Sequence, residues 1–178
     1  MRALLTWSSP QSFLGVACRL HRVPASGAGR HGHFDRASHP IPILLSNESP
    51  FLLISQPSVD QVNAWIDPDA PIDPACFRAN FILAGPTSPA FFEDDLKLLR
   101  IGDATFQVLA RCRRCLMVCV DQATGCKTRE PFSCLAKTRK SARGRIEFGV
   151  HLLWRDDLAK SVRPQLRVGD GVAFSNEV

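Results

Sequence analysis

The chain has 178 residues, enough for one well-buried domain. Hydrophobic residues make up 45% and charged residues 22%, and no apolar run approaches the length of a membrane-spanning helix, so we expect no membrane-spanning segment in this sequence. The net charge of +5 suits an anionic ligand without requiring one.

Seven cysteines are present, an odd number. A framework of structural disulfides would more naturally use an even number, so we expect reduced thiols in a reducing compartment, the cytoplasm. A Cys-x-x-Cys pair in such a chain is expected to be catalytic, metal-binding or redox-active.

The first part of the chain predicts a short strand at residues 14–23, followed by a loop rich in Gly, Pro and scattered charge up to residue 42. His31 and His33 lie in this loop, where an isolated histidine pair is usually solvated. The first five residues superficially resemble a targeting peptide, but their apolar run is too short for a secretory signal. We therefore expect a chain that begins inside a larger protein, with a lead-in strand and mobile loop at residues 1–42 and the main domain at 43–178.

The main domain is predicted to contain several short strands and few helices. Ser58 is expected to cap a helix that carries Val59 and Val62 on its apolar face and ends before Pro68. The predicted strands cover residues 51–54, 77–83, 101–109, 116–120, 148–153 and 166–174. An acidic connector at 91–98, a turn at 121–125 and a short basic helix at 132–140 separate some of them. This pattern favours a mostly antiparallel β-barrel or sandwich.

The residues with the clearest chemistry are Cys112 and Cys115, which form a Cys-x-x-Cys pair among three arginines. Ten Lys or Arg residues lie between positions 111 and 145, against two acidic residues. Neighbouring guanidinium groups stabilise a thiolate and also supply paired donors for a phosphate. This segment is therefore the candidate site.

Other functions fit this segment less well. A structural zinc site normally needs a second ligand pair, and a strand at 116–120 would place Cys119 about 13 Å from Cys115. Nucleic-acid binding is disfavoured because no aromatic residues lie among the arginines to stack on bases, and the chain contains no tyrosine. Cysteine is also a common inert core residue. The cysteines expected to fit that description are Cys18, Cys76, Cys119, Cys126 and Cys134, with Cys112 as a further candidate and Cys115 as the poorest fit.

The order of these motifs resembles the MOSC domain family. The blocks that carry the resemblance are IGD at 101–103, CRRC at 112–115, VDQATG at 120–125, EP at 130–131, LAK at 135–137, FG at 148–149 and VGD at 168–170. Upstream, SNESPFLLI at 46–54, FRAN at 77–80 and FLGVAC at 13–18 continue it. Within the family, the sequence of the CRRC block is most similar to the C-terminal part of fungal-type molybdenum cofactor sulfurases.

The resemblance implies a MOSC-type β-barrel, mostly β with a few short helices, that binds molybdenum cofactor in its molybdopterin form. It implies that Cys115 is the catalytic thiol, acting as molybdenum ligand or as sulfur carrier. Arg78 and Asn80 match a block implicated in holding the pterin and its phosphate. Ser49 and Arg114 fall on cofactor-facing positions.

The same resemblance implies a role in cofactor sulfuration for enzymes of the xanthine dehydrogenase and aldehyde oxidase type. A complete sulfurase also carries a pyridoxal-phosphate cysteine desulfurase module, for which this chain has no room. The expected partners are therefore a desulfurase domain in cis or in trans and recipient molybdenum hydroxylases, with no nucleic acid and no membrane. Two alternatives stay open: a molybdenum oxidoreductase of the amidoxime-reducing type, and a truncated, non-catalytic relic.

Overall fold

The computed structural model describes residues 10–19, 29–43, 46–66, 69, 71–85, 88–158 and 164–175. The strands are β1 (Arg30–Gly32), β2 (Ile41–Ile43), β3 (Phe51–Ser55), β4 (Phe81–Leu83), β5 (Leu98–Ile101), β6 (Ala104–Arg113), β7 (Glu147–Trp154) and β8 (Val172–Ser175). The α-helices are α1 (Pro10–Leu14), α2 (Gln56–Trp65) and α3 (Phe132–Thr138). Short 3-10 helices are η1 (Pro74–Phe77), η2 (Phe92–Asp95), η3 (Leu116–Cys119) and η4 (Asp156–Leu158). The prediction of a mostly β chain with a few short helices is confirmed.

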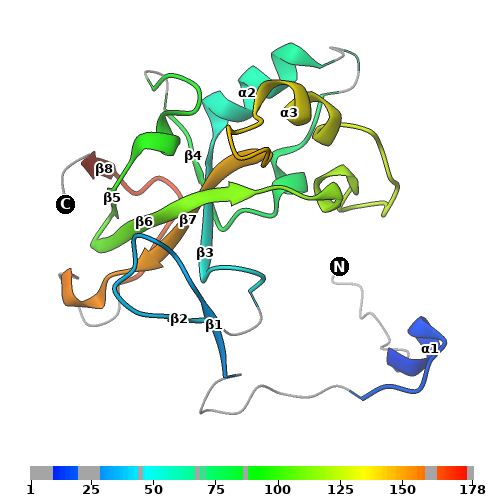
Figure 1. Cartoon of the computed structure of the whole chain (residues 1–178), viewed down its shortest axis with the longest axis horizontal. Helices are drawn as coiled ribbons and strands as arrows, with labels where there is room; N and C mark the ends of the chain where they lie inside the picture. The colour runs from blue at the N-terminus through cyan, green and yellow to red at the C-terminus, as the bar shows by residue number, and fades with distance from the viewer. Residues whose placement is uncertain are drawn as a thin grey trace, which may run out of the picture.

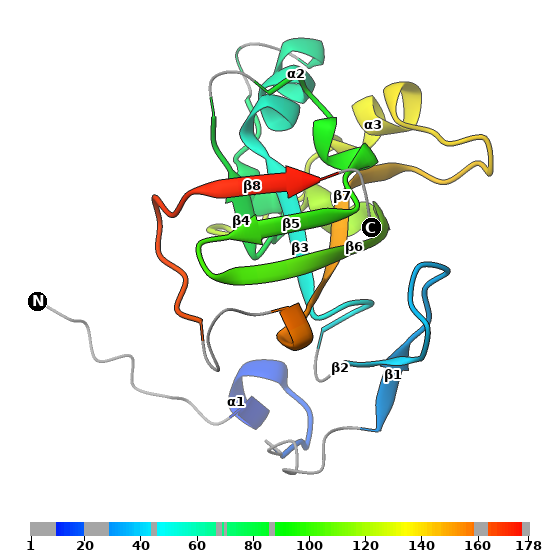
Figure 2. The same cartoon turned by 90° about the vertical axis from the view of Figure 1, so that its left-hand side faces the viewer.

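Six strands form one sheet in the order β4-β3-β7-β6-β5-β8. The sheet curls into a half-barrel, with β5, β6 and β8 stacked at one side (Figures 1 and 2). Its pairs are antiparallel except β3 with β4, which run parallel. Strands β1 and β2 form a separate two-stranded ribbon. No helix among the described residues is long and apolar enough to cross a membrane.

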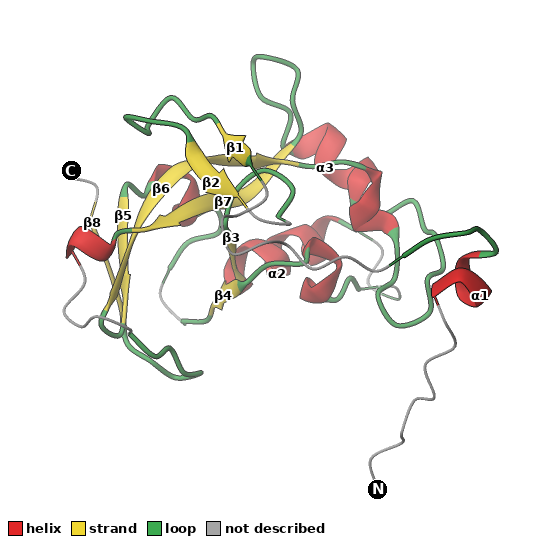
Figure 3. Ribbon diagram, turned by 90° about the horizontal axis from the view of Figure 1, so that it is seen from below, coloured by secondary structure: helices red, strands yellow, loops and turns green. Residues whose placement is uncertain are grey.

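Two hydrophobic cores lie on opposite faces of the sheet. Leu53 and Ile54 are adjacent on β3 and fully buried, and because side chains alternate along a strand each belongs to a different core. One core packs β3, β5, β6 and β7 together. The other joins the sheet to α2 and α3, which lie side by side at one end of the sheet (Figures 1 and 3). This second core leads to the end of β6, where the CRRC segment begins.

Gly149 interrupts the regular alternation of β7. Its φ is +72°, a conformation that favours glycine. Phe148 packs in the core beside the helices, whereas Val150 and Leu152 pack in the other core. A Cβ atom at position 149 would lie 2.6 Å from the Leu53 carbonyl oxygen, closer than side chains tolerate. The glycine therefore lets β7 approach β3 while its side chains change faces.

We predict that Gly149→Ala lowers the free energy of unfolding by about 2–4 kcal/mol, because left-handed strain and overpacking add. Gly125 provides a matched control, since it has the same φ of +72° and nothing within 4 Å of an added Cβ. Gly125→Ala should lower the free energy of unfolding by about 1 kcal/mol, because only the backbone strain acts there. Urea unfolding of both variants measures the difference, and equal losses would show that the contact with β3 is unimportant.

Several predicted elements differ from the structure. Residues 116–120 do not form a strand, because 116–119 form the 3-10 helix η3. The strand predicted at 14–23 is wrong in its described part: α1 ends at Leu14 and residues 15–19 carry no strand, while 20–23 lie outside the described residues. The loop predicted up to residue 42 contains β1 and most of β2. Strand β4 is shorter than predicted, because η1 occupies its expected start.

The start of α2 lies three residues before the predicted one. Ser55, not Ser58, is the N-cap, and its side chain accepts the Ser58 backbone N–H. Both serine hydroxyls also donate to the carboxylate of Glu93, at 2.8 and 2.9 Å. Glu93 is fully buried, although it lies in what the sequence predicts as an acidic connector. This polar cluster ties β3, α2 and η2 together.

Candidate functional site

A cavity of about 580 Å³ lies beside the end of β6. Its walls come from the segment before β3, the turn after η1, the CRRC segment and β7. The structure brings all five sequence-predicted site residues to this cavity, namely Ser49, Arg78, Asn80, Arg114 and Cys115. Cys112, Arg113, Arg30 and His151 also line it. Residues separated by up to 121 positions, from Arg30 to His151, therefore line one cavity.

Cys115 presents an exposed thiol at the N-terminus of η3. Its backbone is extended, and its side chain makes no capping hydrogen bond. Cys112 is only 6% exposed, and its thiol donates to the Arg113 carbonyl oxygen at 3.5 Å. Burial raises the pKa of Cys112 to about 11 despite the nearby Arg114 guanidinium. The expectation that the arginines stabilise a thiolate is therefore wrong for Cys112, because desolvation outweighs the attraction.

The Arg114 guanidinium in the cavity wall lies beside the stacked rings of Phe77 and Phe148, whose centres are 4.2 Å apart. Its Nε donates to the Phe148 carbonyl oxygen at 2.8 Å and its Nη1 to the Phe77 carbonyl oxygen at 3.2 Å. The guanidinium carbon lies 5.1 Å and 5.9 Å from the centres of the same two rings. Burial lowers the pKa of Arg114, while the thiols of Cys112, Cys76 and Cys115 oppose that shift. No described residue accepts a hydrogen bond from the buried Nη2 atom, so both N–H groups of this nitrogen lack a partner.

Arg78 and Asn80 lie on the turn between η1 and β4. Arg78 has a φ of +54°, which is unusual for a residue with a side chain, and it is exposed. Asn80 pairs with Leu52 twice: its side-chain oxygen accepts the Leu52 N–H at 2.8 Å, and its backbone N–H donates to the Leu52 oxygen at 2.9 Å. This double hydrogen bond fixes the turn to β3. Asn80 therefore holds Arg78 at the rim of the cavity.

Ser49 is buried, and its hydroxyl is engaged within the protein. It donates to the Phe51 carbonyl oxygen at 2.7 Å and lies 2.7 Å from Nδ1 of His151. The other ring nitrogen of His151 lies 3.1 Å from the Glu48 carboxylate. Burial lowers the pKa of His151, although Glu48 opposes this. The position of Ser49 at the cavity is as predicted, but its hydroxyl serves to orient His151.

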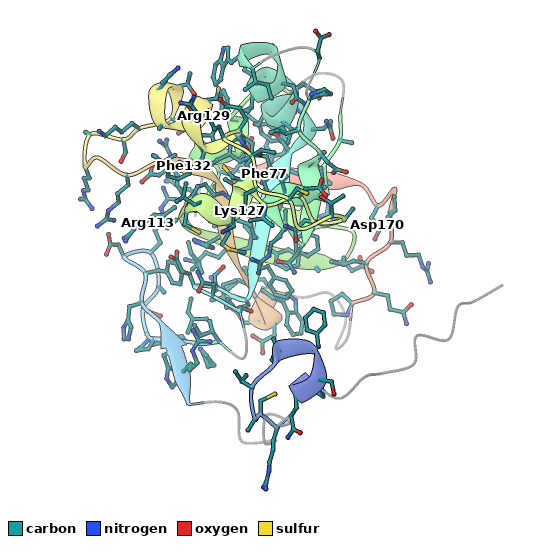
Figure 4. The ribbon with its side chains drawn as sticks, turned by 90° about the vertical axis from the view of Figure 1, so that its right-hand side faces the viewer. Phe77, Arg113, Lys127, Arg129, Phe132 and Asp170 are labelled. Atoms are coloured by element: carbon teal, nitrogen blue, oxygen red, sulfur yellow. The ribbon has the colours of Figure 1, made fainter. Side chains whose placement is uncertain are left out.

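Sequence reasoning missed His151 and Glu48 as a pair, because 103 positions separate them. It also missed a second cavity of about 650 Å³ on the other side of this pair. The two cavities share Arg30, Asn47, Glu48, Arg113 and His151. The second cavity adds Arg111, Arg143 and Arg145. Figure 4 labels Arg113 and Phe77, which both line the first cavity.

The other cysteines fall into three groups. Cys119 and Cys134 are buried, as expected of inert core residues, and Cys18 and Cys76 are half-buried. Cys126 is exposed, so its prediction as a buried residue is wrong, because it follows the surface turn at 121–125. Since residues 116–119 form η3, the distance argument against zinc based on a strand there does not hold. Within the described ranges, no group of three His, Cys, Asp or Glu side chains could hold a metal ion.

Comparisons with known proteins show the family to which this chain belongs. The family described as "MOSC domain" matches residues 40–173. A protein named molybdenum cofactor sulfurase from Pyricularia oryzae is 45% identical over 125 residues, which cover 63% of this chain and 15% of the relative. Sulfurases of the same name from Aspergillus clavatus and Aspergillus niger are 36% and 39% identical, over 92% and 79% of this chain. The chain spans 25% or less of the length of these relatives.

Proposed function

Because the chain belongs to the MOSC domain family, we propose that it binds molybdenum cofactor in the molybdopterin form and takes part in its sulfuration. In that reaction a terminal oxo ligand of the cofactor is exchanged for sulfur. The similarity to fungal molybdenum cofactor sulfurases supports this assignment. The recipients of the product would be hydroxylases of the xanthine dehydrogenase and aldehyde oxidase type.

One observation carries the proposal: an exposed thiol and four arginines line the same cavity. The arginines are Arg30, Arg78, Arg113 and Arg114. Guanidinium groups recognise phosphate through paired N–H donors, and a thiolate is a suitable ligand for a soft metal centre. The donor set therefore fits a cofactor that combines a phosphate with a sulfur-ligated metal. Among the described residues, the buried Nη2 of Arg114 has no hydrogen-bond partner, so the wall contains a buried cationic group that is not fully hydrogen-bonded.

Each residue has a separate task in this proposal. Arg78 and Arg113 are exposed at the cavity and bind the phosphate. Asn80 fixes the turn that carries Arg78, and Ser49 fixes the ring of His151. Cys115 provides the thiol for metal ligation or sulfur transfer. When bound, the cofactor supplies the metal centre at which sulfur replaces oxygen.

The sulfur itself would come from another module. A pyridoxal-phosphate cysteine desulfurase produces a protein-bound persulfide, which is the form in which sulfur can pass to a cysteine thiol. The exposed position of Cys115 makes its thiol accessible to such a donor. We propose that this donor acts in cis or in trans, and that the process takes place in the cytoplasm.

A titration with molybdenum cofactor tests the proposal, with Arg78→Gly as the decisive variant. Glycine tolerates the backbone of position 78, so stability should change by less than about 1 kcal/mol. Loss of the guanidinium should weaken binding by about 2 kcal/mol, or roughly 30-fold. Arg100→Ala is the control, since Arg100 is exposed and lies outside the cavity. A cooperatively folded wild-type chain that binds no cofactor would refute the proposal.

A further inference from the structure

The second cavity, of about 650 Å³, has a wall rich in arginine that the proposed cofactor site uses only in part. It lies between the β1–β2 ribbon, the end of β6 and the turn between α3 and β7. Its arginines are Arg30, Arg111, Arg113, Arg143 and Arg145. Arg30 and Arg113 also line the first cavity, whereas the other three do not. Most of this positive charge therefore lies outside the candidate cofactor site.

The protein itself uses only part of this charge. The Arg111 guanidinium forms ion pairs with two carboxylates of η2, at 3.6 and 3.4 Å. The side chains of Arg113, Arg143 and Arg145 form neither a hydrogen bond nor an ion pair with any residue that the structure describes. Three cations at one cavity are therefore available to an external anion.

Three carboxylates line the same cavity without neutralising these cations. They belong to Asp35, Glu48 and Glu147. Glu48 is engaged with His151 at 3.1 Å. Glu147 is the register partner of Arg113 on the neighbouring strand, yet neither Glu147 nor Asp35 forms an ion pair in the described part of the chain. These carboxylates repel a weakly charged anion, so the cavity favours a ligand with more than one negative charge.

The turn that carries Arg143 and Arg145 is ordered by its own hydrogen bonds. It is the extended loop between α3 and β7 in Figure 2. The Ser141 N–H donates to the Arg145 carbonyl oxygen at 2.8 Å, and the Ser141 hydroxyl accepts the Arg145 N–H at 3.2 Å. Gly144, with a φ of +75°, closes the turn by donating to the Ser141 carbonyl oxygen at 2.8 Å. The backbone therefore holds both arginines at the cavity before any ligand binds.

We propose that the second cavity binds the phosphate group of a small molecule, with Arg143 and Arg145 as donors and the shared Arg113 at its boundary. Guanidinium groups recognise phosphate through paired N–H donors. A phosphate monoester carries about 1.5 to 2 negative charges at neutral pH and three acceptor oxygens. It therefore gains more from three free cations than a monocarboxylate does. This site is additional to the proposed cofactor function.

The size of the cavity favours a phosphate ester over free phosphate. A volume of about 650 Å³ lies in the range of small-molecule pockets, about 300–1,000 Å³, and exceeds what one phosphate group fills. Phe34 and Ile43 add an apolar part to the wall, and the Phe34 ring is half-buried, 5.7 Å from the His151 ring. The organic part of the ester would contact these side chains.

The test is calorimetric titration of the purified full chain, without cofactor, at constant ionic strength. The probes are phenyl phosphate, inorganic phosphate and benzoate. Phenyl phosphate should bind saturably, more tightly than inorganic phosphate and much more tightly than benzoate. The double variant Arg143→Ala/Arg145→Ala should weaken the binding of both phosphates on the order of thirtyfold. Equal affinity for the two phosphates would support the site and assign it to free phosphate.

Arg100→Ala is the control for a general loss of positive charge, because Arg100 is exposed and lines neither cavity. It should bind phenyl phosphate as the wild type does. The thermal midpoints of all variants without ligand should agree, since the Arg143 and Arg145 side chains make no hydrogen bond within the described residues. A folded wild-type chain that binds no phosphate would overturn the inference. Equal weakening by Arg100→Ala, or benzoate binding as tight as that of phenyl phosphate, would also overturn it.

A crossed experiment separates this site from the cofactor site. Arg78 lines only the first cavity, so Arg78→Gly should retain phenyl phosphate binding, and the double variant should bind molybdenum cofactor within about twofold of the wild type. Phosphate binding lost in Arg78→Gly but kept in the double variant would place the phosphate in the first cavity and overturn the inference. A thirtyfold loss of cofactor affinity in the double variant would make the second cavity part of the cofactor site, which also overturns it. Absent phosphate binding with intact cofactor binding would leave the proposed function standing.

Discussion

Cys115→Ala should abolish the ability of the chain to support cofactor sulfuration, while the protein stays folded. The side chain is exposed and makes no capping hydrogen bond, so its loss should change the free energy of unfolding by less than about 0.5 kcal/mol. The thiol, in contrast, is the accessible nucleophile of the cavity, and alanine cannot accept sulfur or ligate a metal. Sulfuration is measured with a cysteine desulfurase, cysteine and cofactor, by activation of a recipient hydroxylase.

The control for this substitution is Cys126→Ala, because Cys126 is also exposed but lies outside the cavity. The two variants should have equal thermal midpoints and opposite activities. Full sulfuration by Cys115→Ala would exclude Cys115 both as carrier and as essential ligand. Loss of activity in both variants would show that the assay reports general thiol damage.

Glu93→Ala should cause the largest loss of stability, about 3–5 kcal/mol. Glu93 is fully buried and accepts three hydrogen bonds, from the Ser55 N–H and from the hydroxyls of Ser55 and Ser58. Its removal leaves buried donors without an acceptor and opens a cavity between β3, α2 and η2. Urea unfolding at neutral pH measures the change.

Two further variants separate the causes of this loss. Glu93→Gln keeps the size and one acceptor oxygen, so the loss should fall to about 1–2 kcal/mol. Asp95 lies on the same 3-10 helix, but its side chain is 82% exposed and, among the described residues, forms an ion pair only with Arg111. The loss for Asp95→Ala should therefore be below about 1 kcal/mol. Similar losses for Glu93→Ala and Asp95→Ala would mean that the buried cluster contributes little.

The sequence predicted best where one physical signal dominates. Strands β3 and β7 are mostly apolar and largely buried on both faces, and both were predicted to within one residue at each end. The turn at 121–125 was also predicted correctly, because the Asp121 carboxylate accepts two backbone N–H groups and the Thr124 hydroxyl. Local chemistry determines these elements, so the sequence alone is informative.

The prediction failed where tertiary packing decides between conformations. Residues 116–119 are apolar, and a run that short does not distinguish a strand from a buried helical turn. The burial of Val118 and Cys119 against α3 selects the 3-10 form. The burial of Glu93 was also unpredictable, since its serine partners lie 35 and 38 positions away.

The candidate site was predicted in part. The five residues taken from the family blocks do line one cavity, although composition alone could not have brought them together. The sequence could not show which of these side chains are engaged in hydrogen bonds within the protein. Arg114 is engaged with backbone oxygens, Ser49 with His151 and Asn80 with Leu52. These contacts depend on the folded approach of β3, β6 and β7.

The wall between the two cavities has a thermodynamic consequence. Five residues belong to both cavities, among them the cations Arg30 and Arg113. An anion bound in either cavity would partly neutralise these two guanidinium groups, and it would also repel an anion in the other cavity. Linkage then requires that each anion weakens the binding of the other by the same factor. We therefore expect an anion in the second cavity to lower the affinity of the first cavity for an anion.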